Sequence, residues 1–372
     1  MPGVVSMREH SETQRKPSYF RGQCWGAIGL VVGALKGCFC LPVELRIHQG
    51  FVHLGQAPAP TDSSHTGLGE RVVQMALAFA RHHDRPAWLV LDAFFPTARV
   101  FRLARSVYSI ALQQPYLHLL VRAKKHYVAY FPPAPKAPHR RGRPPRYGDK
   151  VRLQECFDHP HLFETVHCQI YGQLEAVQLL ALPLLWKPLG DWLLFIFAIT
   201  SRGPIVLMSS DLTLAPTTAL ELYCVRARIE IMFDVMKNII KAFCFRFWTH
   251  HLPRQPRRPR ANRYLQAPAA SHLSTVAACW QAYETFVFCA AIAHGLLQLI
   301  ALRFGPLVWQ HHRLYLRTQS RALPSEKTVK QVIAPLLAKQ FVHLSQNSIL
   351  QKIQRCVDND DDDDCKDDRW VA

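Results

Sequence analysis

The order of apolar segments between residues 24 and 130 constrains the fold of this chain more than any other feature. Short apolar runs that predict strands alternate with longer segments whose apolar residues recur at helical spacing. The order is strand, strand, helix, strand, helix, strand, at residues 24–35, 37–47, 67–83, 87–95, 97–110 and 117–130. The second of these helices is expected to turn Val100, Leu103, Val107 and Ile110 inward. This alternation predicts an α/β domain in which Asp92 lies near the end of a buried strand.

The charge of the chain predicts a polyanionic partner. Lys and Arg number 45 against 27 Asp and Glu, so the formal net charge is +18. Residues 358–372 carry eight Asp against Lys366 and Arg369, so the rest of the chain is more basic still. A chain this basic outside its acidic C-terminal segment indicates binding to nucleic acid. The alternative interpretation is a soluble protein whose basic side chains are only solvated. Apolar residues make up 49% of the 372, enough for one large or two ordinary globular domains.

Four polar residues in the segment 216–242, which is expected to be one helix, share a face. Tyr223, Arg226, Glu230 and Lys237 follow one another at intervals of three, four and seven. At about 100° per residue they fall within roughly 60° of arc, so one carboxylate would lie beside two cations and a phenol. This array suits a metal ion flanked by phosphates. An ordinary amphipathic helix with a solvated charged face is the alternative.

These residues resemble the Tyr-Arg-Glu-Lys signature of insertion-sequence transposases with a DDE catalytic triad. Every spacing matches, and two further blocks agree with that family. Leu89-Val-Leu-Asp92-Ala-Phe-Phe95 is similar to the strand that carries the second catalytic Asp. Tyr19-Phe-Arg-Gly-Gln-Cys-Trp25-Gly-Ala-Ile-Gly29 is similar to the strand that follows the first catalytic Asp. The resemblance covers roughly residues 18–323, and Ala227 departs from it where the family usually has Trp.

The resemblance implies a ribonuclease-H-like α/β core that lacks its first strand, with a β-rich insertion and a helical C-terminal part. A disordered or displaced segment is expected at residues 1–18, and the first part of the catalytic domain at 19–131. The insertion, with a basic loop, is expected at 132–212. The catalytic helix and the C-terminal helical part are expected at 213–345, and a helix end with an acidic disordered tail at 346–372.

The resemblance also implies metal-assisted phosphoryl transfer on double-stranded DNA. Members of the family cleave transposon ends and join them to target DNA with two Mg²⁺ or Mn²⁺ ions, which prefer carboxylate oxygens as ligands. Asp92 and Glu230 match two of the three carboxylate positions, so they are the expected catalytic and metal-binding residues. The positions that match phosphate-binding residues are Tyr223, Arg226 and Lys237, with Lys241 one turn further along the same expected face.

Two basic, proline-rich loops are expected to follow DNA. They span residues 136–150 and 253–260, and their prolines keep them extended with the charges exposed. The core Arg141-Gly-Arg143-Pro of the first loop resembles a minor-groove hook. A flexible basic loop without a partner is the alternative. The expected DNA-binding residues of the first loop are Arg140, Arg141, Arg143 and Arg146.

The first catalytic Asp of the family has no counterpart in residues 1–24. That segment contains no Asp, and Glu9 and Glu12 lie in a polar stretch without a strand pattern. We therefore expect a truncated copy of a transposase that lacks the first catalytic Asp and is inactive. The alternative is a non-catalytic DNA-binding remnant that occupies transposon ends or inhibits a full-length transposase. By resemblance, a homodimer on paired ends is expected, with a cytoplasmic location at the nucleoid.

Cysteine usage and one apolar segment bear on the compartment. Eleven Cys occur without the spacing of a disulfide framework and no signal peptide precedes them, so we expect reduced thiols in the cytosol. Residues 179–200 are apolar enough for a membrane span, but charges, prolines and a glycine interrupt them, which favours two buried strands around a turn.

A zinc site is one interpretation of a Cys and His cluster, but its spacing matches no standard site and a histidine-rich sheet edge is favoured. The cluster is Cys156, His159, His161, His167 and Cys168.

Overall fold

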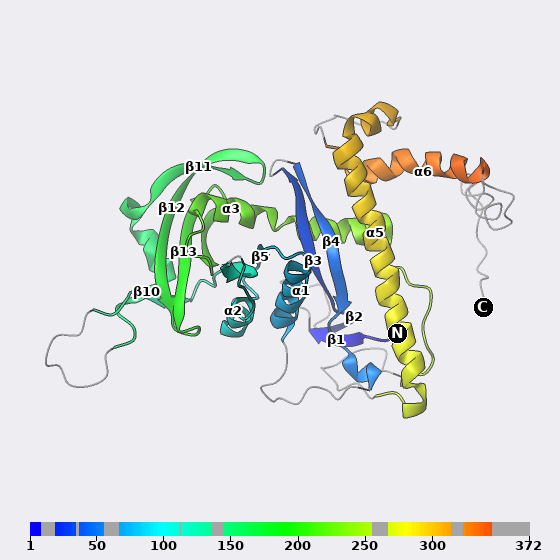
Figure 1. Cartoon of the computed structure of the whole chain (residues 1–372), viewed down its shortest axis with the longest axis horizontal. Helices are drawn as coiled ribbons and strands as arrows, with labels where there is room; N and C mark the ends of the chain where they lie inside the picture. The colour runs from blue at the N-terminus through cyan, green and yellow to red at the C-terminus, as the bar shows by residue number, and fades with distance from the viewer. Residues whose placement is uncertain are drawn as a thin grey trace.

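A mixed β-sheet, a separate β-hairpin and a long C-terminal helix follow one another across the protein, as the computed structural model shows (Figure 1). The structure describes residues 1–8, 19–34, 37–55, 67–111, 113–134, 145–254, 267–313 and 323–343. This mixed α/β arrangement of sheet and helices agrees with the α/β class expected from the sequence.

The main sheet has eight strands in the order β10-β9-β12-β13-β14-β8-β5, with β11 paired to β12 beside this path. Strands β5 and β8 run parallel, with Leu91 opposite Val121, and the other pairs are antiparallel. The strands are β5 (Ala87–Leu91), β8 (Leu117–Arg122), β9 (Val128–Tyr130), β10 (Lys150–Arg152), β11 (Glu164–Ile170), β12 (Gln173–Trp186), β13 (Asp191–Thr200) and β14 (Gly203–Ser209). The strands of residues 132–212 thus extend the same sheet as β5 and β8.

Both faces of the central part of this sheet are buried because β13 is apolar from Trp192 to Ile199. Alternation along β13 sends Phe195 and Phe197 to one face and Ile196 to the other. The helices α1 (Leu68–His82) and α2 (Ala98–Arg105) cover the first face, and α3 (Pro216–Val225) covers the second. The sheet therefore holds the end of β5 between two helical layers.

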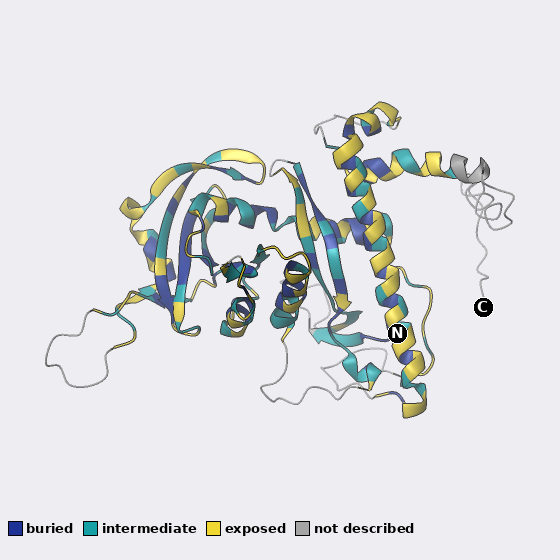
Figure 2. Ribbon diagram, viewed as in Figure 1, coloured by how far each residue is buried: buried dark blue, intermediate teal, exposed yellow. Residues whose placement is uncertain are grey.

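The hairpin of β3 (Trp25–Ala34) and β4 (Gly37–Ile47) forms a sheet of its own among the described residues. Helix α1 contacts both β3 and β5, so it joins the hairpin to the main sheet. On its other side the hairpin packs against α5 (Leu273–His311), where residues of β4 and α5 share a core with the segment that follows α3. Figure 2 shows that the side of α5 turned away from the hairpin is largely exposed.

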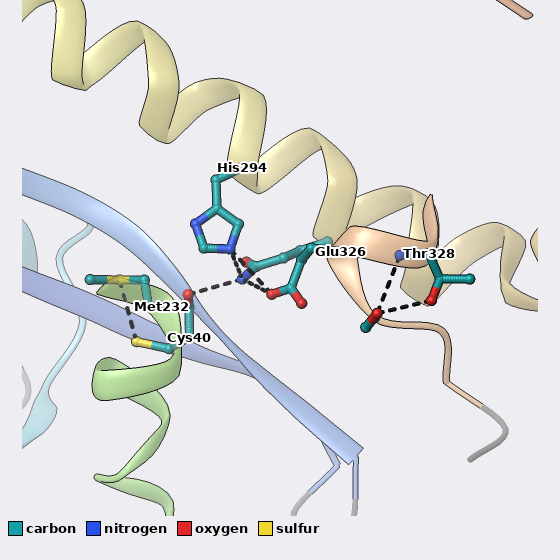
Figure 3. A network of polar contacts seen from close by, with 7 residues as sticks. Cys40, Met232, His294, Glu326 and Thr328 are labelled. Atoms are coloured by element: carbon teal, nitrogen blue, oxygen red, sulfur yellow. Dashed lines mark hydrogen bonds and ion pairs between the residues drawn. The ribbon is translucent and has the colours of Figure 1, made fainter. Parts of the chain in front are cut away.

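A buried polar network fastens α6 (Glu326–His343) to α5 and β4 (Figure 3). The Nε2 atom of His294 lies 3.2 Å from Oε1 of Glu326. Gln298 donates from Nε2 to the same carboxylate oxygen at 3.1 Å and to the carbonyl of Cys40 at 3.0 Å. All three polar side chains are buried, so the network fixes the beginning of α6.

The remaining elements are short. They are β1 (Val4–Arg8), β2 (Tyr19–Gln23), β6 (Tyr108–Ser109), β7 (Gln114–Pro115), α4 (Arg228–Asp234), the π-helix η4 (Val235–Ile240), and the 3-10 helices η1 (Phe51–Leu54), η2 (Leu153–Asp158), η3 (Pro160–Leu162) and η5 (Ala270–His272).

Several elements expected from the sequence are confirmed. The predicted hairpin at residues 24–47 is β3 and β4, and the apolar segment 179–200 lies in β12 and β13 around a turn. The predicted helix at residues 67–83 is α1. The predicted strand that begins at Leu117 is β8. In each case a simple apolar period coincides with burial on one or both faces.

Three expectations are wrong in part. Helix α2 ends at Arg105, so Ile110, which was expected to face inward, is 82% exposed. The segment 1–18 was expected to be disordered or displaced, yet Val4–Arg8 pairs with Tyr19–Gln23 because β2 supplies backbone partners that composition does not reveal. The helix expected over residues 216–242 is divided into α3, α4 and η4. Residues 9–18 lie outside the described part of the chain.

Candidate active site

Asp92 follows the last residue of β5 at the carboxyl end of the parallel pair β5–β8. A hydrogen bond between neighbouring residues stabilises the turn after the strand: Asp92 Oδ1 accepts from the backbone N–H of Ala93 at 2.7 Å. The side chain of Thr97 then caps α2 by accepting from the N–H of Val100. In sheets with parallel strands this end is the usual position of polar functional groups. The side chain of Asp92 is 47% exposed and is therefore accessible.

The Tyr-Arg-Glu-Lys segment is helical in three pieces. Between α3 and α4 the backbone N–H of Arg226 bonds to the carbonyl of Tyr223, and that of Glu230 bonds to the carbonyl of Ala227. These i to i−3 bonds are tighter than α-helical ones. The π-helix η4 then widens the next turn before Lys241 leaves the helix with φ of 63°. A constant 100° per residue therefore does not describe this segment.

Arg226 connects the two acidic residues. Its Nη1 lies 3.9 Å from Oδ2 of Asp92, and its Nη2 lies 3.3 Å from Oε1 of Glu230. The two guanidinium nitrogens are only about 2.3 Å apart, so the two carboxylate oxygens lie within about 10 Å of each other. Burial alone would lower the pKa of Arg226, but Asp92, Tyr223 and Glu230 outweigh it, so the pKa is raised and the cation is secured.

Tyr223 contributes a buried phenol to the same group. The guanidinium carbon of Arg226 lies 5.7 Å from the centre of the Tyr223 ring. Burial, followed by the negative charge of Asp92, raises the pKa of Tyr223, and the nearby cations Arg226 and Arg122 oppose the shift. The phenol is therefore a neutral hydrogen-bonding group at ordinary pH.

Sequence reasoning missed Arg122 as a member of this group. Its positive charge lies near the phenol of Tyr223 and opposes the rise in the pKa of that group. Because Leu91 pairs with Val121 in parallel register, Asp92 and Arg122 leave neighbouring strands at the same edge of the sheet. The signal in the sequence was a basic residue, Arg122, at the end of the apolar strand that comes next along the sheet after β5.

The structure does not group every expected residue at this point. Lys237 and Lys241 are exposed, and η4 and the left-handed conformation of Lys241 disrupt the face that both were expected to share with Arg226. Lys241 was expected one regular turn further along the same face, and this geometric expectation is wrong because the α-helix does not reach it. Arg146 donates from Nη2 to the carbonyl of Gly190 at 2.9 Å, so it anchors one end of its loop to the turn between β12 and β13. Arg140, Arg141 and Arg143 lie outside the described residues.

The Cys and His cluster does not assemble into a metal site where the structure describes it. Cys156 belongs to the core under α1 and α2, whereas Cys168 belongs to the core under α3, on the other face of the sheet. In the described segments no group of three or more His, Cys, Asp or Glu side chains is positioned to hold a metal ion. Cys156 and Cys168 therefore do not lie in one site in this structure, and the histidine-rich sheet edge stays a prediction.

The two carboxylates at Arg226 suit a hard divalent cation by the type of their donor atoms. Mg²⁺ and Mn²⁺ take oxygen ligands, and both carboxylates are exposed, at 47% for Asp92 and 69% for Glu230. In this structure the guanidinium of Arg226 balances the charges of both carboxylates. Among the described residues, these two fit a divalent ion as carboxylate ligands, one fewer than the triad of the resembling family.

A comparison with protein families supports a nuclease relationship. Residues 27–180 match the family of DDE superfamily endonucleases. The matched segment runs from β3 to β12 and therefore includes Asp92, Arg122 and the whole of β5 and β8. It ends before Tyr223, so the Tyr-Arg-Glu-Lys segment lies outside the match. No curated protein shows a significant match to the chain. The match supports relationship to DDE-type transposases and nucleases, a family that acts on DNA and typically uses divalent metal ions.

Proposed function

We propose that this protein is a DDE-type transposase in which Asp92 and Glu230 hold Mg²⁺ or Mn²⁺ and which, as this chain stands, does not cleave DNA. The observation that carries the proposal is the position of Arg226 between Asp92 and Glu230, at 3.9 and 3.3 Å. The residues come from two distant parts of the sequence, and one of them lies in the segment matched by the DDE superfamily endonucleases.

The reaction of the family is DNA cleavage at transposon ends followed by strand transfer. A divalent ion bound there would supply activation of the attacking oxygen and stabilisation of the leaving oxygen of the phosphodiester. Asp92 and Glu230 would hold it through carboxylate oxygens, and Arg226 would bind a non-bridging phosphate oxygen while its charge balances the carboxylates. Tyr223 remains protonated and donates a hydrogen bond to the DNA backbone, and Lys237 contacts a phosphate as a point charge.

A loss of cleavage follows from the number of carboxylates. Two carboxylates neutralise less of the charge of two divalent ions than three do, and they leave coordination positions unfixed. In-line attack requires the reacting groups to be held within about 0.5 Å of their productive positions. The chain therefore binds metal and DNA at this point but places neither for reaction.

Its proposed location is the cytoplasm, on the transposon DNA of the nucleoid, with two copies on paired ends.

A second candidate function is a non-catalytic DNA-binding protein that occupies transposon ends and inhibits a full-length transposase. The same two-carboxylate arrangement favours it, since the DNA-binding charges do not depend on a complete triad. The two functions differ in the cell: the inhibitor lowers the transposition frequency of an intact element in the same cell, whereas a transposase copy that is only unreactive leaves that frequency unchanged.

The test is a cleavage assay on duplexes taken from the sequence that flanks the gene, with Mg²⁺ and with Mn²⁺. We expect retarded mobility of the duplex without cleavage. Asp92→Ala is the companion variant, because cleavage by the wild-type chain that disappears in Asp92→Ala would overturn the proposed inactivity. Asp234→Asn is the matched control: its carboxylate lies on the same segment but bonds to Asn238 at 2.6 Å and not to Arg226. A chain that neither retards nor cleaves DNA would overturn both candidate functions.

A further inference from the structure

The segment of residues 243–251 comes shortly after η4 and runs along α5 towards η5 (Figure 1). It contains neither helix nor strand, but its rings attach it to its neighbours. The ring of Phe245 lies 4.5 Å from that of Tyr283 of α5, centre to centre. At the far end the ring of His251 stacks on that of His272 in η5 at 4.0 Å. The segment is therefore held to α5 and η5 along its length.

Tyr283 fixes the backbone immediately before Trp248. The ring of Phe247 stacks on that of Tyr283, with 4.9 Å between the centres and 21° between the planes. The phenol of Tyr283, which is fully buried, donates to the carbonyl of Phe247 at 2.7 Å. The peptide that leads into Trp248 is thus held in place before any ligand arrives, which lowers the entropy cost of binding.

Large aromatic side chains are exposed where this segment meets α5. The exposed fraction is 62% for Trp248, 40% for Phe286 and 36% for Phe247. The ring of His250 meets the indole of Trp248 edge-on, at 6.5 Å and 79°. Such a contact covers at most one face of the indole, so the other face is open to solvent. These four residues and the exposed Arg246 are called the Trp248 surface.

The charge around the Trp248 surface is positive. From Val235 to Tyr283 the sequence has eight Lys and Arg and three His but no Asp or Glu. The one acidic residue of α5 is Glu284, and its carboxylate, 18% exposed, already pairs with Arg46. The surface therefore complements a polyanion.

We infer that the Trp248 surface binds unpaired bases of single-stranded DNA. A base shows its flat face only where the strand is unpaired, because in a duplex the neighbouring base pairs cover it. Exposed aromatic rings on which bases stack, with cations along the backbone, are the features by which proteins bind single strands. Trp248 supplies the stacking ring, and Arg246 pairs with a phosphate.

A lipid surface is the other ligand that exposed aromatic and basic residues suggest. A helix that lies on a membrane presents a continuous apolar face. Exposed apolar residues of α5 such as Ile292 and Leu299 provide such a face, but on a regular helix they lie about 120° and 140° around the axis from Phe286. The Trp248 surface is therefore separate from the apolar side of α5, and its rings and cations favour DNA.

The inference rests on the proposed function in that its ligand is DNA, and it extends that function from duplex DNA to unpaired strands. It involves neither Asp92 nor Glu230. The Asp92→Asn variant is therefore expected to bind single strands like the wild type.

The experiment is fluorescence anisotropy of the full chain with labelled oligothymidine of about 16 nucleotides, and in parallel with a duplex of the same length. Trp248→Ala is expected to raise the dissociation constant for oligothymidine by about 5- to 100-fold and to leave that for the duplex nearly unchanged. Trp248→Phe keeps a flat ring and is expected to recover most of the affinity. Trp88→Ala is the matched control, because Trp88 is 46% exposed but lies on β5, and it is expected to bind like the wild type.

A salt series separates stacking from charge. Arg246→Ala is expected to reduce the slope of log K against log salt for oligothymidine by about 0.7, since it removes one phosphate contact with a single strand. Trp248→Ala removes no charge and is expected to keep the wild-type slope. Arg85→Ala, which removes an exposed charge just before β5, is the control for Arg246→Ala and is expected to keep it too.

Two results would overturn the inference and leave the proposed function standing: a wild type that binds the duplex but not oligothymidine, or an equal loss for both DNAs in Trp248→Ala. A chain that binds neither DNA would overturn both. Trp248→Ala that binds oligothymidine normally but no longer binds vesicles of phosphatidylcholine and phosphatidylglycerol would assign the Trp248 surface to a membrane instead.

Discussion

The Nη1 atom of Arg226 lies 3.9 Å from the carboxylate of Asp92, which joins the end of β5 to the turn between α3 and α4. This contact aligns the exposed edge of the parallel strand pair with the Tyr-Arg-Glu-Lys segment. The same guanidinium also holds Glu230. Arg226 is thus the counter-ion of two carboxylates. Removal of Arg226 makes the net charge of the site more negative, and binding of a metal ion makes it more positive.

The first prediction concerns metal binding. Asp92→Asn and Glu230→Gln each remove one of the two carboxylate charges, and we expect each to raise the dissociation constant for Mn²⁺ by about 10-fold or more, since loss of even an outer partner of a ligand costs about 10–100-fold. Titration calorimetry or electron paramagnetic resonance of Mn²⁺ gives the constant. Asp234→Asn removes a carboxylate from α4 that Arg226 does not contact, and its constant should equal that of the wild type. Equal binding by all four proteins would exclude the site at Arg226.

The second prediction concerns Arg122, whose positive charge lies near Tyr223 and opposes the rise in the pKa of its phenol. Arg122→Ala removes one positive charge at the carboxyl end of β8, so we expect a weaker complex with duplex DNA and a decrease of about 1 in the slope of log K against log salt. Arg85→Ala removes an exposed charge near the opposite end of the strand pair and should leave the slope unchanged. Fluorescence anisotropy over a salt series gives both slopes. If the slopes of Arg122→Ala and Arg85→Ala are equal, Arg122 does not contact the DNA.

The third prediction concerns the basic loop. Replacement of its four arginines by Ala should flatten the salt dependence of DNA binding by about 3, because each phosphate contact contributes about 0.9 to the slope. Arg146 is expected to contribute least, since it already bonds to the carbonyl of Gly190. The replaced residues are Arg140, Arg141, Arg143 and Arg146. Arg152→Ala, whose guanidinium pairs with Glu155, is the control in the neighbouring strand. A slope that remains at the wild-type value would show that the loop does not contact DNA.

The sequence predicted the apolar strands and the first helix well because their signals are local. Strands β5, β8 and β13 are continuous apolar runs, and α1 has a simple helical period, so burial follows directly from composition. The end of α2 was predicted less well. Apolar residues continue at helical spacing beyond Arg105, but the chain turns into β6 and exposes Ile110. The pairing of β6 with β7, in which Tyr108 lies opposite Pro115, is a cause that the helical period does not contain.

The candidate site was predicted in part for a similar reason. Asp92 and Glu230 were identified from motifs, and the structure brings both to Arg226. The role of Arg122 depends on which strand lies beside β5, and the shape of the signature segment depends on the π-helix η4, which a uniform helical period cannot predict. The network of His294, Gln298 and Glu326 had no motif at all, because it joins α5 to the first residue of α6, about 30 positions further along the sequence.

The last prediction concerns this network, in which Glu326 is buried. Burial alone would raise its pKa, but hydrogen bonds with His294, Gln298 and the backbone outweigh burial, so the pKa lies below its ordinary value of 4.5. A carboxyl group with a depressed pKa stabilises the fold above its unfolded-state value, and this stabilisation is lost as the pH falls through the folded value. Glu326→Gln should therefore reduce the free energy of unfolding at pH 7 by about 1–3 kcal/mol. Denaturant unfolding gives this difference.

The pH dependence separates this charge effect from simple loss of packing. The difference between the wild type and Glu326→Gln should shrink as the pH falls below 4.5, because the wild-type carboxyl group then becomes neutral like the amide. Glu44→Gln is the control: Glu44 pairs with Arg46 at the surface of β4, and such a pair contributes only about 0–1 kcal/mol. Hydrogen exchange should place the loss in α6, whose first turn Glu326 fixes to α5. A difference that is the same at pH 7 and at acid pH would mean that the charge of Glu326 does not hold α6 in place.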